Sequence, residues 1–150
     1  MKPTERTTRP QNKIRILLVD DHAKLRAGVR KLLEKNRDMV VVGEAGDGVQ
    51  ALELVKDLQP DIVLLDVEMP RMNGMTAARS ITAQYSNVKI LALSAYDDRQ
   101  YIMNMLDQGA AGYLVKDEVP ELLVQAIRAV RSQKSPWLSK RLESLIQDSR

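Results

Sequence analysis

Residues 61–74 read DIVLLDVEMPRMNG, and the first six of these residues carry the clearest evidence for the architecture of the chain. The run from Asp61 to Leu65 is apolar almost throughout, which is typical of a strand that is covered on both faces. The runs Ile14–Val19 and Val88–Leu93 share this composition. Strands of this kind occur in parallel sheets that carry helices on both sides. The stretch therefore predicts an inner strand of a parallel α/β sheet.

Outward from this stretch, five strand-like runs alternate with five amphipathic stretches that have the apolar spacing of helices. The predicted strands are Ile14–Val19, Met39–Ala45, Asp61–Leu65, Val88–Leu93 and Gly112–Val115. Five such repeats predict an α/β fold with a five-stranded parallel sheet and helices on both faces. The flavodoxin-like strand order 2-1-3-4-5 fits five units. Asp117 is predicted to cap the last of the five helices, with Pro120 in its first turn.

Length and composition restrict the class of protein. A chain of 150 residues fits one domain with short extensions. It has no cysteine, which excludes disulfides and thiolate metal sites and suits a reducing cytoplasm. No apolar run approaches the roughly 20 residues that span a bilayer. The first residues lack the apolar stretch of a secretory signal. We therefore expect a cytoplasmic protein without membrane contact.

The net charge of +3 is unevenly distributed along the chain. Basic residues are in excess in 1–13 and in 131–150, whereas 14–130 is mildly acidic. Residues 1–12 are predicted to be a disordered basic leader. Binding to nucleic acid would need a basic stripe with base-reading side chains, and 14–130 has none. Solvated tails are the preferred interpretation of both ends.

Residues 132–150 form a tail. Pro136 interrupts the chain, after which Leu138, Leu142, Leu145 and Ile146 recur at helical spacing. This pattern predicts a short amphipathic helix over 137–147, either packed on the body as a cap or beginning a linker.

Polar residues stand where four of the five predicted strands end. Asp20 and Asp21 follow the first strand, Asp66 ends the third, Ser94 the fourth and Lys116 the fifth. Ligands of such sheets bind beyond the carboxyl ends of the strands, where the strand order reverses. We therefore expect these five side chains to gather at one rim.

Three carboxylates at one rim repel one another, so their ionisation requires a nearby cation. Lys116 is one candidate, and Mg²⁺ is another because it favours carboxylate, water and phosphate oxygens. The set resembles a phosphoryl-transfer site. Asp66 would be the nucleophile, and Asp20 and Asp21 would hold the metal. Lys116 would pair with one phosphoryl oxygen, and the Ser94 hydroxyl would donate to another.

Simpler interpretations exist for each feature. Asp21 could cap the first helix, Ser94 could be a turn residue, and Lys116 could merely be exposed. His22, the only histidine, is expected on a helix surface. The glycines of the segment 43–48 follow the second strand rather than the first, which disfavours a nucleotide pocket. A small flavin-binding protein with the same fold is a further alternative, although an acidic rim would repel flavin phosphate.

Four stretches together resemble a response-regulator receiver domain over about residues 13–131. They are ILLVDDH at 16–22, DIVLLDVEMPRMNG at 61–74, ILALSA at 90–95 and GAAGYLVKD at 109–117. The DDH opening, VVGEAGDG at 41–48 and GAAGYLVKD are similar to the subfamily that carries a LuxR-like helix-turn-helix output domain.

The resemblance implies roles for individual residues. Asp66 becomes the acceptor of phosphate from a sensor histidine kinase. Asp20, Asp21 and Asp66 become the Mg²⁺ carboxylates, and the main-chain carbonyl of Glu68 a further ligand. Ser94 and Tyr113 become the switch pair. Such a protein is no enzyme beyond its own phosphorylation and dephosphorylation, and it commonly forms a homodimer when phosphorylated.

Two departures from the family pattern stand out. Asp117 follows the lysine where many receivers have proline, and a cis bond at a non-proline residue is costly. No helix-turn-helix output domain follows, and we expect a truncated chain rather than a stand-alone receiver. Contact with DNA would then require the absent output domain. A pseudo-receiver, an interaction module with the same fold, is the alternative function.

Overall fold

The computed structural model describes residues 13–68, 74–133 and 136–148. The predicted leader, residues 1–12, lies outside the described residues. Six parallel strands form one sheet in the order β2-β1-β3-β4-β5-β6. The strands are β1 (Ile14–Val19), β2 (Met39–Ala45), β3 (Ile62–Asp66), β4 (Lys89–Ser94), β5 (Gly112–Val115) and β6 (Trp137–Leu138). The reversal of strand order lies between β1 and β3, as predicted.

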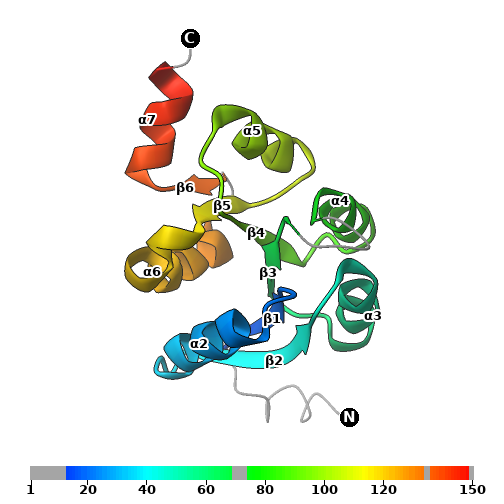
Figure 1. Ribbon diagram of the computed structural model, residues 1–150. Helices are drawn as coiled ribbons and strands as arrows, with labels where there is room; N and C mark the ends of the chain where they lie inside the picture. The colour runs from blue at the N-terminus through cyan, green and yellow to red at the C-terminus, as the bar shows by residue number, and fades with distance from the viewer. Residues whose placement is uncertain (1–12, 69–73, 134–135, 149–150) are drawn as a thin grey trace.

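Helices cover both faces of the sheet (Figure 1). They are α2 (Ala23–Glu34), α3 (Gly48–Leu58), α4 (Gly74–Gln84), α5 (Arg99–Asp107), α6 (Val119–Ser132) and α7 (Lys140–Asp148). Apolar residues of α2 and α6 pack on one face, and those of α3, α4, α5 and α7 pack on the other. Successive strand residues point to opposite faces. Ile16 and Leu18 of β1 accordingly face α2, whereas Leu17 and Val19 belong to the opposite core.

The inner strands explain why the chain adopts a parallel sheet. Every residue of β3 is buried, and Ile62, Val63 and Leu65 have no exposed surface. A strand of this composition has to be covered on both sides, and the connecting helices do so. The predicted bounds of three strands are reproduced, and β3 and β4 are shifted by one residue.

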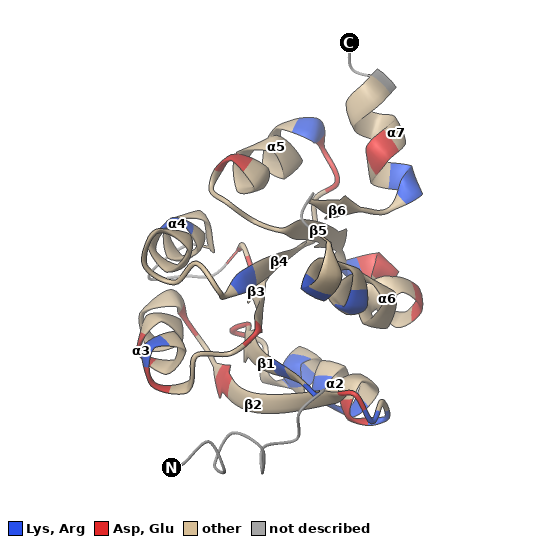
Figure 2. Cartoon of the chain, turned by 180° about the vertical axis from the view of Figure 1, so that it is seen from behind, with Lys and Arg blue, Asp and Glu red and all other residues tan. Residues whose placement is uncertain are grey.

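Figure 2 marks basic residues on α2 and α6, and side chains of both helices pair with acidic residues of neighbouring segments. Arg30 and Arg26 of α2 both contact the Glu44 carboxylate, at 2.5 and 3.0 Å. Arg128 of α6 lies 2.9 Å from Asp38. Arg26, Arg30 and Arg128 therefore serve contacts within the fold. Within the described segments, no helix has the length and apolarity needed to cross a membrane.

The prediction of five strands is wrong by one, because the tail contributes β6. Trp137 and Leu138 pair in parallel with Gly112 and Tyr113 of β5. The main-chain N–H of Trp137 also donates to the Ala111 carbonyl at 2.8 Å. The tail thus completes the sheet edge, and only the second part of the predicted helix 137–147 is helical.

The helix of the tail is packed on the body. Ser139 precedes α7, and its hydroxyl accepts a hydrogen bond from the Leu142 N–H at 3.3 Å. Leu142 has no exposed surface, and it joins the core on the side of α5. Arg141 pairs with Asp97 at 2.8 Å and with Asp117 at 3.2 Å. The tail helix α7 is therefore packed on the body of the domain.

The start of α6 corrects the predicted cap. A short 3-10 helix, η1 (Lys116–Glu118), separates β5 from α6. Asp117 lies within η1 and pairs with Arg141 rather than capping α6. The buried Glu118 carboxylate accepts a hydrogen bond from the Val115 N–H at 3.1 Å. Pro120 does lie in the first turn of α6, and the described peptide bonds, Lys116–Asp117 included, are trans.

Candidate functional site

Four acidic or imidazole side chains meet where β1 and β3 end. Each of Asp20, Asp21, His22 and Asp66 offers one ligand atom, and these atoms lie within 4.8 Å of one another. Asp66 is the last residue of β3, and Asp20 directly follows β1, which pairs with β3. The strand register alone therefore brings two distant parts of the sequence together. Asp21 and His22 are exposed at the mouth of the cluster.

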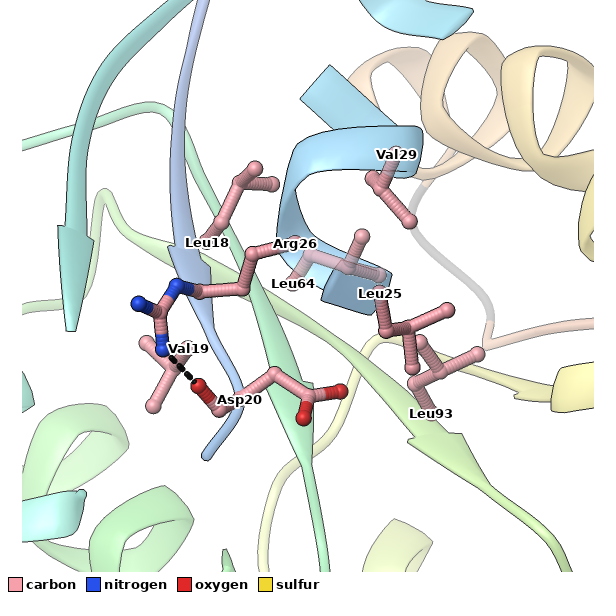
Figure 3. A pocket seen from close by; sticks show the side chains of 8 residues that line it. All are labelled: Leu18, Val19, Asp20, Leu25, Arg26, Val29, Leu64 and Leu93. Carbon is pink, nitrogen blue, oxygen red and sulfur yellow. Dashed lines mark hydrogen bonds between the residues drawn. The ribbon is translucent and has the colours of Figure 1, made fainter. Parts of the chain in front are cut away.

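Hydrogen bonds hold both the side chain and the main-chain carbonyl of Asp20. Its Oδ1 accepts a hydrogen bond from the His22 main-chain N–H at 2.8 Å and lies 3.1 Å from the His22 ring. Its main-chain carbonyl accepts from the Arg26 guanidinium (Figure 3). These contacts hold one carboxylate oxygen and leave Oδ2 without a hydrogen bond. The simpler interpretation of Asp21 is not supported, because no side-chain hydrogen bond caps α2.

Beside Asp20 lies a small cavity with a volume of about 10 Å³. Leucine and valine side chains of α2, β1, β3 and β4 form most of its wall, and Asp20 stands at its polar end (Figure 3). A void of this size holds at most about one water molecule. The apolar wall excludes solvent from one side of the carboxylate cluster, and this strengthens the electrostatic interactions of Asp20.

Asp66 is the most deeply buried acid of the cluster. Its side chain has no exposed surface, and Oδ1 accepts a hydrogen bond from the Glu68 N–H at 2.9 Å. Lys116 Nζ lies 3.4 Å from Oδ2 as an ion pair without hydrogen-bond geometry. Burial raises the pKa of Asp66 to about 6. The Glu68 N–H and Lys116 lower this pKa, whereas the Asp20 and Glu68 charges raise it.

Two carboxylate oxygens of the cluster lack a donor. Among the described residues, the buried side-chain oxygens without any hydrogen bond are Asp20 Oδ2 and Asp66 Oδ2. Unsatisfied buried oxygens are costly, and two on neighbouring acids also repel. A hard cation relieves both costs, and carboxylate oxygens are the ligands that Mg²⁺ prefers. The donor set therefore fits a divalent metal ion.

Ser94, at the end of β4, is the hydroxyl of the site. It has no exposed surface, and it donates a hydrogen bond to the Glu68 carboxylate. The Ala95 N–H lies 3.3 Å from the other oxygen of the same carboxylate. The Ser94 hydroxyl also accepts from the Tyr96 N–H at 3.0 Å. Ser94 thus lies in a small network of its own, next to Asp66.

Tyr113, on β5, is fully buried. Its hydroxyl donates to the Tyr96 carbonyl at 2.7 Å. Burial raises the pKa of Tyr113 to about 12, and contact with the Ser94 hydroxyl opposes this rise. The ring is therefore directed inward and is linked to Ser94 through Tyr96.

The structure brings Asp20, Asp21, Asp66, Ser94 and Lys116 to one rim, as the order of the strands predicts. Sequence reasoning did not predict the contact of the Glu68 side chain with Ser94, since the predicted ligand set contains only the main-chain carbonyl of Glu68. It placed His22 on a helix surface, at the start of the first predicted helix and beside the site, and His22 does directly precede α2. The His22 side chain is 65% exposed, but its Nδ1 lies 3.1 Å from Asp20 and 3.2 Å from Asp21. The proximity of His22 to both carboxylates needed three-dimensional information.

Comparisons with known proteins give the family of the chain. Residues 16–128 match the response regulator receiver domain. The chain is 40% identical over 120 residues to the transcriptional regulatory protein DegU of Brevibacillus brevis, which covers 80% of this chain and 51% of DegU. It is 41% identical over 112 residues to the nitrate/nitrite response regulator protein NarL of Escherichia coli K12, which covers 75% and 52%. The chain thus spans about half the length of the curated relatives it matches.

A solved structure shows the same architecture over nearly the whole chain. The two-component response regulator of the LuxR family from Aurantimonas sp. SI85-9A1 has a TM-score of 0.87 at 33% identity. The match covers 92% of this chain and 98% of that chain. This chain belongs to the response regulator receiver domain family, with relatives of the LuxR and NarL type.

Proposed function

We propose that this domain accepts a phosphoryl group on Asp66 from the phosphohistidine of a sensor histidine kinase, with Mg²⁺ at Asp20, Asp21 and Asp66. The observation that carries the proposal is the pair of buried oxygens without donors, Asp20 Oδ2 and Asp66 Oδ2. Bound Mg²⁺ would neutralise phosphoryl oxygens and the carboxylates around them. The main-chain carbonyl of Glu68 is proposed as a further ligand. We place this reaction in the cytoplasm.

The residues of the chain supply the remaining chemistry. An Asp66 oxygen attacks phosphorus, the bond from phosphorus to the histidine nitrogen breaks, and an acyl phosphate forms on Asp66. With a pKa near 6 even without metal, Asp66 is mainly ionised at neutral pH. Lys116, at 3.4 Å from Asp66, is placed to pair with a phosphoryl oxygen. The Ser94 hydroxyl donates to another.

The effect of phosphorylation then has to be transmitted to a partner. A phosphoryl dianion that recruits Ser94 changes the network through which Ser94 and Tyr113 are linked. We propose that this pair is the switch, that residues 13–131 are the receiver unit, and that residues 132–150 lead toward a transcription-regulating output domain. Such a domain would provide any DNA contact. Dimerisation of phosphorylated copies belongs to the same proposal.

The test is incubation with acetyl phosphate and Mg²⁺, followed by intact mass spectrometry. Wild type should gain one phosphoryl mass, and chelation of Mg²⁺ should abolish the gain. Asp66→Ala should gain nothing. Asp57→Asn is a matched control, because Asp57 is an exposed acid on α3 away from the rim. Equal labelling of wild type and Asp66→Ala would contradict the proposal, and metal binding without any labelling would favour a pseudo-receiver.

A further inference from the structure

The Glu68 side chain makes contacts that the proposed function does not use. Its Oε2 accepts the hydroxyl hydrogen of Ser94, and its Oε1 lies 3.3 Å from the Ala95 N–H. Its own main-chain N–H donates to Asp66 at 2.9 Å. One carboxylate is therefore held by two donors at the end of β4, directly beside the proposed phosphate acceptor.

The two donors form a cradle for an anion. Ser94 is fully buried, so its hydroxyl hydrogen needs an acceptor within the protein. In this structure the acceptor is Glu68. After phosphorylation of Asp66, the same hydroxyl is the proposed partner of a phosphoryl oxygen. A single hydroxyl hydrogen cannot serve both anions at full strength. The negative charge of Glu68 would also repel an arriving phosphoryl dianion.

We propose that the Glu68 carboxylate is a resident stand-in for the phosphoryl group. In the phosphate-free protein it occupies the cradle of the Ser94 hydroxyl and the Ala95 N–H, and it has to leave when a phosphoryl group binds. This inference rests on the proposed function of Asp66. Glu68 is a positioning residue, since it acts through Ser94.

The occupied cradle has a structural consequence beyond competition. The Tyr96 N–H donates to the Ser94 hydroxyl oxygen at 3.0 Å, and the Tyr96 carbonyl accepts from Tyr113 at 2.7 Å. The anchored Ser94 therefore holds the Tyr96 backbone, which in turn holds the buried Tyr113 ring. Glu68 thus keeps the Ser94–Tyr113 pair in its inward arrangement before any phosphate arrives.

The experiment measures binding of beryllofluoride, a noncovalent phosphoryl mimic, at saturating Mg²⁺ by fluorine NMR. Glu68→Gln removes the charge at constant size, and Glu68→Asp keeps the charge but shortens the side chain. Both should bind beryllofluoride about tenfold more tightly than wild type, the effect of releasing one charge-assisted hydrogen bond. Glu53→Gln, an exposed acid of α3, should not change the affinity. Calorimetry of Mg²⁺ alone separates any change in metal affinity.

A second readout addresses positioning. Without beryllofluoride, the Tyr96 amide should exchange hydrogen faster in Glu68→Asp than in wild type, because the shortened side chain withdraws the acceptor of the Ser94 hydroxyl. With beryllofluoride bound, the two rates should converge. Unchanged affinity and unchanged exchange in both Glu68 variants would overturn the inference while leaving phosphate uptake by Asp66 intact. Absence of beryllofluoride binding in wild type would instead overturn the proposed function, and the inference with it.

Discussion

Replacement of Asp66 by asparagine should make the metal-free protein more stable. Asp66 has no exposed surface, and burial is the largest cause that raises its pKa from 3.8 to about 6. A rise of about two pKa units corresponds to about 3 kcal/mol of destabilisation once the carboxyl is ionised. Asparagine removes the charge, and its oxygen can still accept the hydrogen bond from the Glu68 N–H.

The sign of the pH dependence follows from the raised pKa. Below the unfolded value of 3.8 the carboxyl is protonated in both states, so the charge costs nothing. As pH rises through the folded value near 6, the cost becomes complete and stability is lost. The advantage of Asp66→Asn should be full at about pH 7.5 and fall to about half at pH 5. Mg²⁺ at a hundredfold excess over its Kd should stabilise wild type by about 2.7 kcal/mol and largely remove the difference.

The assay is thermal unfolding of both proteins in EDTA and in Mg²⁺ across this pH range. A gain of about 3 kcal/mol corresponds to a rise in Tm of roughly 6 to 12 °C for a chain of this size. Asp57→Asn controls for the loss of an acid elsewhere. A mutant no more stable than wild type in EDTA at neutral pH would contradict this prediction. So would an advantage that stays constant as pH falls.

Three further predictions concern residues around the rim and the tail. The Tyr96 ring, stacked on Tyr101 at 4.7 Å, stands two residues beyond Ser94, so Tyr96→Ala should shorten the lifetime of the acyl phosphate by admitting water. An unchanged half-life, followed by mass spectrometry, would remove this role. Leu142→Ala should cost about 2 to 5 kcal/mol in urea unfolding because Leu142 is fully buried, and a loss below about 0.5 kcal/mol would show that α7 is not packed in solution. Trp137 is 9% exposed, so the same unfolding should shift its fluorescence to longer wavelength. Emission already typical of solvent in the native protein would contradict a paired β6.

The sequence predicted the elements that depend on the residues within them. β1, β2 and β5 begin and end at the predicted residues, because their β-branched and apolar composition is a local signal. The strand of Trp137 and Leu138 left no such signal. Two residues are too short for a periodicity, and their pairing depends on the free edge of β5, which is a tertiary feature. The same residues at helical spacing with Leu142 were therefore assigned to a helix.

The site likewise contains residues that the sequence could place and contacts that it could not. The carboxyl ends of parallel strands meet at one edge, so the order of the strands alone was enough to place Asp66, Ser94 and Lys116 together. Contacts made by side chains on loops could not be predicted in this way. The contact of Glu68 with Ser94 depends on how the chain turns after β3. Asp117 does not cap α6 as predicted, because it lies in the 3-10 helix η1 that precedes α6. Loops have no periodic pattern of apolar residues, so their geometry cannot be predicted from such a pattern.

The short strand β6 also determines where the folded unit can be cut. The family match ends at residue 128, before Trp137 and Leu138 pair with β5. A fragment that stopped there would leave the main-chain groups of Gly112 and Tyr113 without their partners at an open sheet edge. Open edges recruit strands from other molecules and promote aggregation. A fragment prepared for solution work should therefore extend past α7, where the edge is covered and the Leu142 side chain remains buried.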